Sequence, residues 1–284
     1  MSGSYYVPHE TKWPFLATLA LMIMFIGLAN YMNDESTLTL TFTGLGLLLL
    51  VIYGWFSYVV RESEGGLYDD QVDMSFRWGM AWFIFSEVMF FAAFFGALYY
   101  ARELSLPWLA GDGSGVSTNQ ELWPSFENVW PSNGPANYGG DFIVMKAAGI
   151  PALNTIILLI SGLTVTWAHH GLKEGKRNQL ISGLVATVLL GFIFVGFQAY
   201  EYSHAYNDLN LKMTSGIYGS TFYMLTGFHG FHVTLGAIML TVILFRCIRG
   251  HFTNENHFGF EAVAWYWHFV DVVWLGLFVF VYWL

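Results

Sequence analysis

The chain has 284 residues, of which 55% are hydrophobic and 11% are charged, and its net charge is −9. A soluble domain has about a quarter charged residues, so this composition indicates a protein that crosses a membrane several times. The negative charge argues against nucleic acid as a partner. The single cysteine, Cys247, excludes an internal disulfide and a cysteine-ligated metal or iron–sulfur site.

Seven apolar stretches are long enough to cross a hydrocarbon core that is roughly 30 Å thick. In chain order, the predicted spans are residues 14–31, 38–60, 78–100, 147–168, 180–202, 218–245 and 262–284. Between them we expect a tight turn at 33–36, an acidic loop at 61–73 and a long outer loop at 101–147, which is rich in Gly, Ser, Asn and Pro. The predicted fold is an all-α polytopic membrane protein, with a two-helix unit over residues 1–76 and a five-helix bundle over residues 77–284.

The basic residues indicate how the spans are oriented. Eight Lys and Arg side chains fall on one side of the predicted membrane and three on the other. By the positive-inside rule, the N-terminus is inside and the C-terminus is outside.

One carboxylate, Glu87, lies near the middle of the third predicted span. An ionised carboxylate is costly in lipid, so this group should be protonated, paired or turned toward protein. Gly79, Ser86 and Ala93 recur every seven residues and predict a small-residue packing seam beside it. Glu87 is then either a neutral acid that hydrogen-bonds a neighbouring helix or a group that handles protons.

Other polar side chains form stripes at helical spacing. They are Gln198, Glu201 and His204 on the fifth span, His229 and His232 on the sixth, and Glu261, His268 and Asp271 on the seventh. Histidines and carboxylates on helices can build di-iron or haem sites, but the spans carry a single Glu-x-x-His pair, Glu201 with His204, and they lack the two spans with well-separated histidines that stacked haems need. The stripes therefore predict a polar network that ties helices together, and no metal site.

Four sequence blocks carry a resemblance to a known family. The first is Arg77-Trp78-Gly79-Met80 with Phe85-Ser86-Glu87-Val88, and the second runs from Asn154-Thr155 to His169-His170. The third runs from Tyr218-Gly219-Ser220 to His232-Val233, and the fourth from His257-Phe258-Gly259 to Val273-Trp274. In this combination and order the chain resembles subunit III of cytochrome c oxidase.

The resemblance implies an architecture and a partner set. In the family, the first two helices splay from the other five around a lipid-filled cleft, and the subunit carries no redox centre. It packs on the catalytic subunit I, beside subunit II, and haem and copper belong to those partners. The resemblance implies that the chain stabilises the catalytic subunit and supports proton uptake in aerobic respiration, in a bacterial or mitochondrial inner membrane.

The resemblance also implies residues that hold phospholipid headgroups. They are Arg61 and Glu62 with the interfacial Trp55, and Arg249 with His251. The sequence departs from the family after residue 63, where Gly65-Gly66-Leu67-Tyr68 replaces a Gly-His-x-Thr pattern and removes a histidine contact. The outer loop at 101–147 also matches poorly.

Two alternatives remain at this stage. Third subunits of quinol oxidases resemble only the last five helices, whereas this chain also has the first two spans. A stand-alone membrane metalloenzyme built on the histidine stripes is the alternative from another class.

Overall fold

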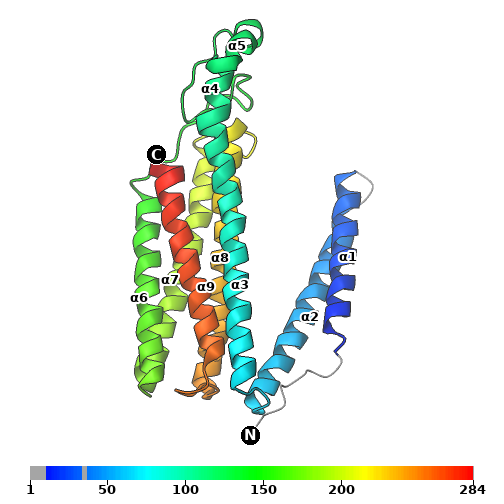
Figure 1. Ribbon diagram of the computed structural model, residues 1–284, viewed down its shortest axis with the longest axis vertical. Helices are drawn as coiled ribbons and strands as arrows, with labels where there is room; N and C mark the ends of the chain where they lie inside the picture. The colour runs from blue at the N-terminus through cyan, green and yellow to red at the C-terminus, as the bar shows by residue number, and fades with distance from the viewer. Residues whose placement is uncertain (1–10, 34–36, 284) are drawn as a thin grey trace. The chain divides into compact units, whose positions relative to one another are not determined.

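The computed structural model describes residues 11–33 and 37–283, and within these ranges the chain forms helices and no strands (Figure 1). Seven of the described helices are long and apolar enough to cross a membrane. The predicted all-α fold with seven spans is therefore confirmed. The predicted turn at 33–36 falls largely on residues 34–36, and the predicted last span ends at residue 284; these residues lie outside the described part.

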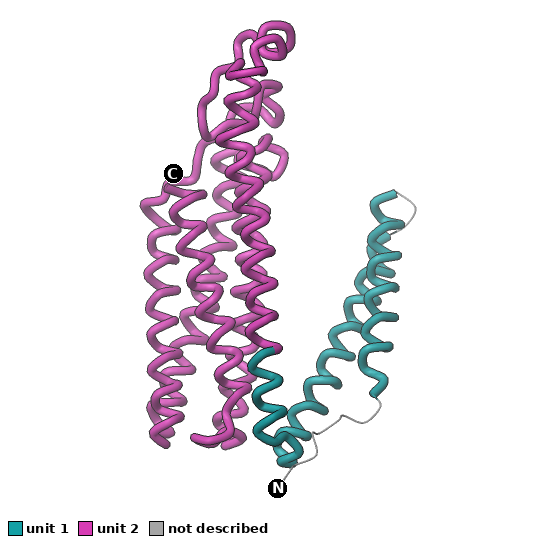
Figure 2. Tube along the Cα trace, viewed as in Figure 1, with its two compact units in different colours: residues 1–78 teal, residues 79–284 magenta. Residues whose placement is uncertain are grey.

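The chain divides into two compact units, residues 1–78 and 79–284 (Figure 2). Unit 1 holds α1 (Trp13–Met32), α2 (Thr39–Glu64) and the first residues of α3. The helices α1 and α2 meet where they carry glycine. A Cβ atom built on Gly27 would lie 2.4 Å from the Thr41 nitrogen, and one on Gly44 would lie 2.3 Å from the Met24 nitrogen. Only glycine permits such a close approach of two backbones in lipid.

The predicted acidic loop at 61–73 is wrong in its extent, because most of it is helical. The helix α2 continues to Glu64, and α3 (Asp70–Tyr100) begins only six residues later. Asp69 caps the new helix, since its Oδ1 accepts a 2.9 Å hydrogen bond from the Val72 amide. Asp70 and Asp73 lie in the first turn, where negative charge is favourable.

The outer loop at 101–147 is also more helical than predicted. The helix continues from α3 through a π-helical turn, η1 (Ala101–Ser105), into α4 (Leu106–Leu109). The whole rod has 40 residues, about 60 Å at 1.5 Å per residue, so it extends past the hydrocarbon core. It is followed by η2 (Gly113–Gly115) and α5 (Val116–Leu122).

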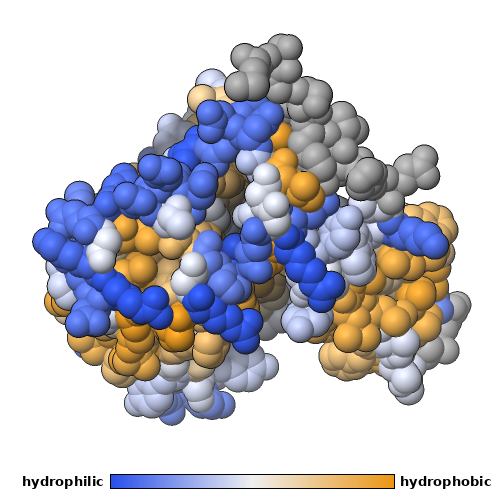
Figure 3. Space-filling model, turned by 90° about the horizontal axis from the view of Figure 1, so that it is seen from below, coloured by the Kyte–Doolittle hydropathy of each residue, from blue (hydrophilic) through white to orange (hydrophobic). Residues whose placement is uncertain are grey.

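The other four helices of the bundle are α6 (Ile150–Lys173), α7 (Arg177–Asn207), α8 (Gly216–Arg249) and α9 (Phe258–Leu277), which ends in a π-helical turn, η3 (Phe278–Trp283). Two buried tryptophans of α9 anchor α6. The Trp267 indole donates a 2.9 Å hydrogen bond to Ser161, and the Trp274 indole donates one of the same length to Thr155. Viewed from below, hydrophilic residues gather on the near end of the molecule and apolar residues on its flanks (Figure 3).

The predicted small-residue seam on α3 is wrong for this bundle. Gly79, Ser86 and Ala93 are all exposed. The opposite, aromatic face packs instead: Phe91 is buried, and Phe90 lies 5.0 Å from Phe228 of α8 between ring centroids. Large rings fill the space between the helices, so α3 joins the bundle through side chains and not through close backbone contact.

Candidate functional site

Glu87 of α3 and His232 of α8 form a pair in the interior of the bundle. The carboxylate Oε2 lies 2.9 Å from His232 Nε2, and the other ring nitrogen, Nδ1, lies 2.6 Å from the Phe228 carbonyl oxygen. A carbonyl oxygen can only accept, so Nδ1 carries a proton and donates it there. In the neutral imidazole, Nε2 is then an acceptor that faces a carboxylate.

This arrangement requires one proton between Glu87 and His232. The pair is either a neutral carboxylic acid that donates to a neutral imidazole or a carboxylate that accepts from an imidazolium, and it is electrically neutral in both forms. The rings around it are apolar: Phe91 lies 5.1 Å and Tyr266 lies 6.3 Å from the His232 ring, measured between centroids. A neutral pair is the form that such surroundings tolerate at lowest cost.

The remaining members of the predicted stripes have separate partners. The fully buried His229 lies 3.1 Å from the Val270 carbonyl oxygen through Nε2, so it binds α9 and not Glu87. Glu201 is also fully buried and accepts a 2.6 Å hydrogen bond from the Tyr282 hydroxyl. His204, one turn further along α7, instead pairs with Asp208 at 2.7 Å on an exposed surface.

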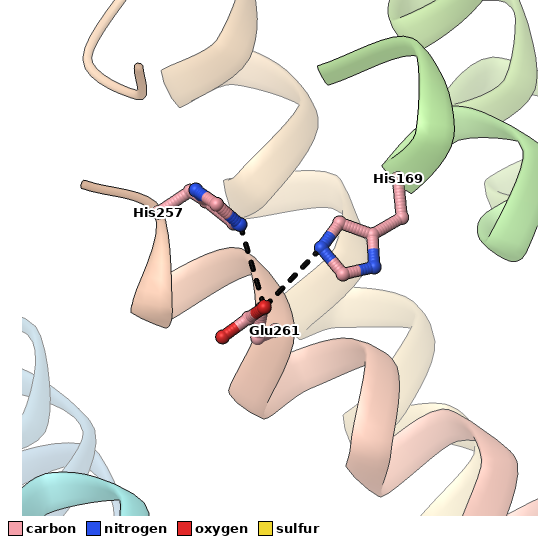
Figure 4. A group of neighbouring side chains, drawn as sticks. All are labelled: His169, His257 and Glu261. Atoms are coloured by element: carbon pink, nitrogen blue, oxygen red, sulfur yellow. Dashed lines mark ion pairs between the residues drawn. The ribbon is translucent and has the colours of Figure 1, made fainter. Parts of the chain in front are cut away.

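A second cluster lies at the end of the bundle where α6 ends and α9 begins (Figure 4). His169 of α6 and His257, which precedes α9, both direct Nε2 toward Glu261 Oε1, at 3.4 Å each. The ligand atoms of the three residues lie within 4.8 Å of one another. His257 Nδ1 lies 3.1 Å from the Thr253 carbonyl oxygen, which fixes the tautomer with a bare Nε2.

The side chains of this cluster can bind a proton or a metal ion between them. A bare imidazole nitrogen and a carboxylate oxygen are both acceptors, so their approach is favourable only with a proton or a metal ion between them. A proton on the carboxyl or on one imidazole meets this requirement, and so does a divalent metal ion, for which two histidines and one carboxylate are a known ligand set. The sequence-based expectation of no metal site stays untested.

His268 and Asp271, which the sequence places on one face with Glu261, lie two to three turns further along α9. His268 Nδ1 is 3.5 Å from Asp271 Oδ2, and its Nε2 is 3.2 Å from the Thr166 hydroxyl of α6. The predicted stripe is therefore divided between the end of the bundle and its middle.

The predicted lipid-binding residues of unit 1 lie beside a groove. Trp13, Tyr53, Tyr58 and Arg61 line this groove, which has a volume of about 250 Å³. The Arg61 guanidinium is exposed and has no ion pair or side-chain hydrogen bond within residues 11–33 and 37–283. Trp13, and not the expected Trp55, lines the groove. Glu62 does not line it, and its Oε2 accepts a 2.8 Å hydrogen bond from the Tyr68 hydroxyl. An aromatic groove with an available guanidinium fits a phosphate headgroup and its chains.

Arg249 and His251 lie in unit 2, at the end of α8. Arg249 is exposed, and the chain turns at Gly250 in the left-handed conformation. A second basic hollow, of about 430 Å³, is lined by Lys176, Arg177, Asn178 and Gln179 at the start of α7. Lys176 there already has a partner in Glu174 at 2.6 Å, and this contact lowers the pKa of the Glu174 carboxyl.

Comparison with known proteins places these features in a family. The family described as Cytochrome c oxidase subunit III matches residues 3–111 and 123–284. The chain is 43% identical to cytochrome c oxidase subunit 3 of Carassius auratus over 281 residues, and 43% identical to that of Gadus morhua over the same length. In both comparisons the match covers 99% of this chain and 97% of the relative. The chain belongs to the cytochrome c oxidase subunit III family.

The match to the subunit III family leaves out residues 112–122, which form η2 and α5 at the tip of the long rod. The outer loop expected to match poorly is therefore matched on both sides of this short insertion. Sequence reasoning missed His169 and His257 as partners of Glu261. The spacing of four between His257 and Glu261 was a readable signal, but the approach of His169 depends on the packing of α6 against α9.

Proposed function

We propose that this chain is the non-catalytic third subunit of a proton-pumping cytochrome c oxidase in aerobic respiration. The observation that carries the proposal is the family match across both the N-terminal pair of helices and the bundle. The relatives carry the name of a cytochrome c oxidase subunit over nearly their whole length. The match to both N-terminal helices also favours this type over the quinol oxidase alternative.

The proposal assigns the redox chemistry to other subunits. Subunits I and II would hold the haem and copper, and this chain would hold neither. Its interior supports this assignment, because His229 and His232 are each engaged by a protein group of the bundle and are not directed toward a common centre. The contribution of this chain would be to stabilise subunit I and to support proton uptake.

The proposal places the chain in a bacterial or mitochondrial inner membrane with the N-terminus inside. A reporter fused at Gly113, in the tip of the outer segment, should respond as external, and one inserted in the 174–176 turn should respond as internal. The opposite responses would contradict this orientation.

The test of the proposal uses the intact complex, purified through a tag on this chain. We expect haem and copper to co-purify, and the complex to oxidise reduced cytochrome c. A complex prepared without this chain should still reduce oxygen, but its activity should decay faster during turnover. Loss of all oxygen reduction in a fully assembled complex after Glu87→Gln would contradict an accessory role.

The cluster of His169, His257 and Glu261 is the one observation that favours the metalloenzyme alternative. Metal analysis of the purified complex with the native chain and with His169→Gln distinguishes an accessory subunit from a metalloenzyme. Under our proposal the metal content is the same in both, because a proton occupies the cluster. A metal ion lost with His169, together with a catalytic defect, would support the alternative.

A further inference from the structure

The cluster of His169, His257 and Glu261 contains two ring nitrogens that no hydrogen bond uses. In the described part of the chain, His169 Nε2 and His257 Nε2 are buried and have no hydrogen-bond partner. Each lies 3.4 Å from Glu261 Oε1, which is longer than the roughly 2.7–3.2 Å of an N–H···O hydrogen bond. His257 is only 7% exposed, so water does not replace the missing partner easily. These separations suit hydrogen bonds poorly, whichever atom carries the proton.

The same separations match those of ligands on one metal ion. Zinc bonds to imidazole nitrogen and carboxylate oxygen are about 2.0–2.2 Å long, and a tetrahedral angle then places two ligand atoms roughly 3.3 Å apart. The two nitrogen–oxygen separations of 3.4 Å are close to this value. The third separation, between the two nitrogens, is at most 4.8 Å, and a rotation of the His169 ring, which is 21% exposed, would shorten it.

Two of the three side chains are held in place by their surroundings. His257 Nδ1 donates to the Thr253 carbonyl oxygen at 3.1 Å. The turn from Thr253 to Asn256 is itself closed by two hydrogen bonds, of 3.2 Å and 2.9 Å. The Glu261 amide donates to the His257 carbonyl oxygen at 3.2 Å, so both side chains belong to the first turn of α9. An imidazole whose outer nitrogen is fixed in this way is typical of metal ligands.

The donor set selects the class of cation. Mg²⁺ and Ca²⁺ take oxygen ligands, whereas two imidazoles and one carboxylate suit Zn²⁺. The two histidines approach the carboxylate from different segments of the chain, with His169 on α6 (Figure 4). Three protein ligands leave the fourth tetrahedral position to water, which can enter beside the partly exposed His169. Among the described residues, no second set of three His, Cys, Asp or Glu side chains brings its ligand atoms this close.

We infer that His169, His257 and Glu261 form a binding site for Zn²⁺. The cation takes the place of the proton that the cluster holds in a complex purified without added metal, and it ties the end of α6 to the start of α9. The site goes beyond the proposed function, and only its position on the inner side of the membrane rests on that proposal.

The test is equilibrium binding of Zn²⁺ to the intact complex, purified through a tag on this chain and freed of loosely held metal with a mild chelator. We expect the native chain to bind one more Zn²⁺ than His169→Gln, and excess Mg²⁺ not to compete. Glu261→Gln should weaken this binding by about 100-fold or more, because even a change outside the ligand shell costs about 10-fold to 100-fold. His170→Gln, at the exposed neighbour of His169, is the matched control and should bind as the native chain does. Equal binding by the native chain and His169→Gln would overturn the inference.

A second measurement needs no variant. The zinc-edge X-ray absorption of the native complex, taken as the difference with and without one added equivalent of Zn²⁺, should show two imidazole nitrogens bound to the metal. A shell of oxygen ligands alone, or one with thiolate, would contradict the site. If the tagged native chain brings down no haem protein, the proposed function fails, and zinc binding by the tagged chain still decides the site. If it does and the native complex binds no additional Zn²⁺, only this inference fails.

Discussion

The helices within the two-helix unit and the helices within the five-helix bundle are held together by different kinds of contact. In unit 1, α1 and α2 meet at Gly27 and Gly44, and few of their other side chains are buried. In the bundle, indoles and imidazoles bridge the helices, as Trp267 does to Ser161 and His232 to Glu87. Association in lipid gains little from the hydrophobic effect, so close packing and hydrogen bonds are the two available means. This difference predicts that a larger side chain at a contact glycine should separate the helices of unit 1, whereas removal of a hydrogen-bonding atom should weaken the packing of the bundle.

The largest effect is expected from Gly44→Val. The new side chain would overlap the backbone of Met24, whose Cα lies 2.6 Å from the built Cβ position. Overpacking of this kind costs about 3 kcal/mol, and here it acts on the main contact of a two-helix unit. Disulfide trapping between cysteines placed in α1 and α2 should fall sharply. Gly46→Val is the matched control, because a Cβ there meets nothing within 4 Å. Equal trapping in both variants would refute close packing as the basis of unit 1.

The next effect is expected from Glu87→Ala in the bundle. The change leaves His232 Nε2 without a partner, which costs about 1–3 kcal/mol. In the purified oxidase, the half-life of activity during turnover should shorten. Glu87→Gln should be mild, since its amide can donate to the same nitrogen. Ser86→Ala, one residue away and exposed, is the control.

The same two variants separate a structural from a proton-handling role. An amide cannot exchange a proton with His232, so a relay would fail in the Gln variant as badly as in the Ala variant. We expect the structural role, in which Glu87→Gln is mild; slowed proton uptake in this variant, with normal assembly, would instead assign the pair to proton handling.

The sequence was sufficient for the seven spans because lipid demands long apolar runs, which are visible without a structure. It was misleading at the span ends, where water meets the chain and caps such as Asp69 decide where a helix begins. The predicted seam at Gly79, Ser86 and Ala93 was also wrong for this bundle. A small-residue repeat has the same spacing whether or not the helix that packs on it lies in the same chain. An aromatic face opposite the repeat decided the packing here.

The candidate sites were predictable as lists of residues but not as pairs. Glu87 was readable as the one carboxylate in its span, but its partner lies 145 residues away in the chain. The histidines at 229 and 232 share a face by spacing, yet they bind different helices. Such pairing depends on how helices rotate against each other, which composition and periodicity do not determine.

A smaller effect is expected from Trp267→Phe. The substitution removes the hydrogen bond to Ser161 while it keeps most of the ring, and polar contacts between membrane helices contribute about 0.6 kcal/mol on average and up to about 1.7 kcal/mol. A double-mutant cycle with Ser161→Ala, read by unfolding in mixed micelles, should return a coupling within that range. Trp167→Phe, at a side chain that is 50% exposed, is the control. A coupling near zero would mean that shape alone holds α9 against α6.

The smallest effect is expected at the groove of unit 1. Arg61→Ala should weaken one bound phospholipid by about 1 kcal/mol, the contribution of one basic side chain near a headgroup. Phospholipid counts after mild detergent washing should fall for Arg61→Ala, fall further when Arg249→Ala is added, and stay near the native count for Arg61→Lys, which keeps the charge. Because Arg61 has no described side-chain partner to lose, the fold of α1 and α2 should be unaffected, and the disulfide trapping used for Gly44→Val can verify this. An unchanged lipid count in the double variant would show that the aromatic walls of the groove hold the lipid without the guanidinium, and would assign Arg61 to membrane orientation alone.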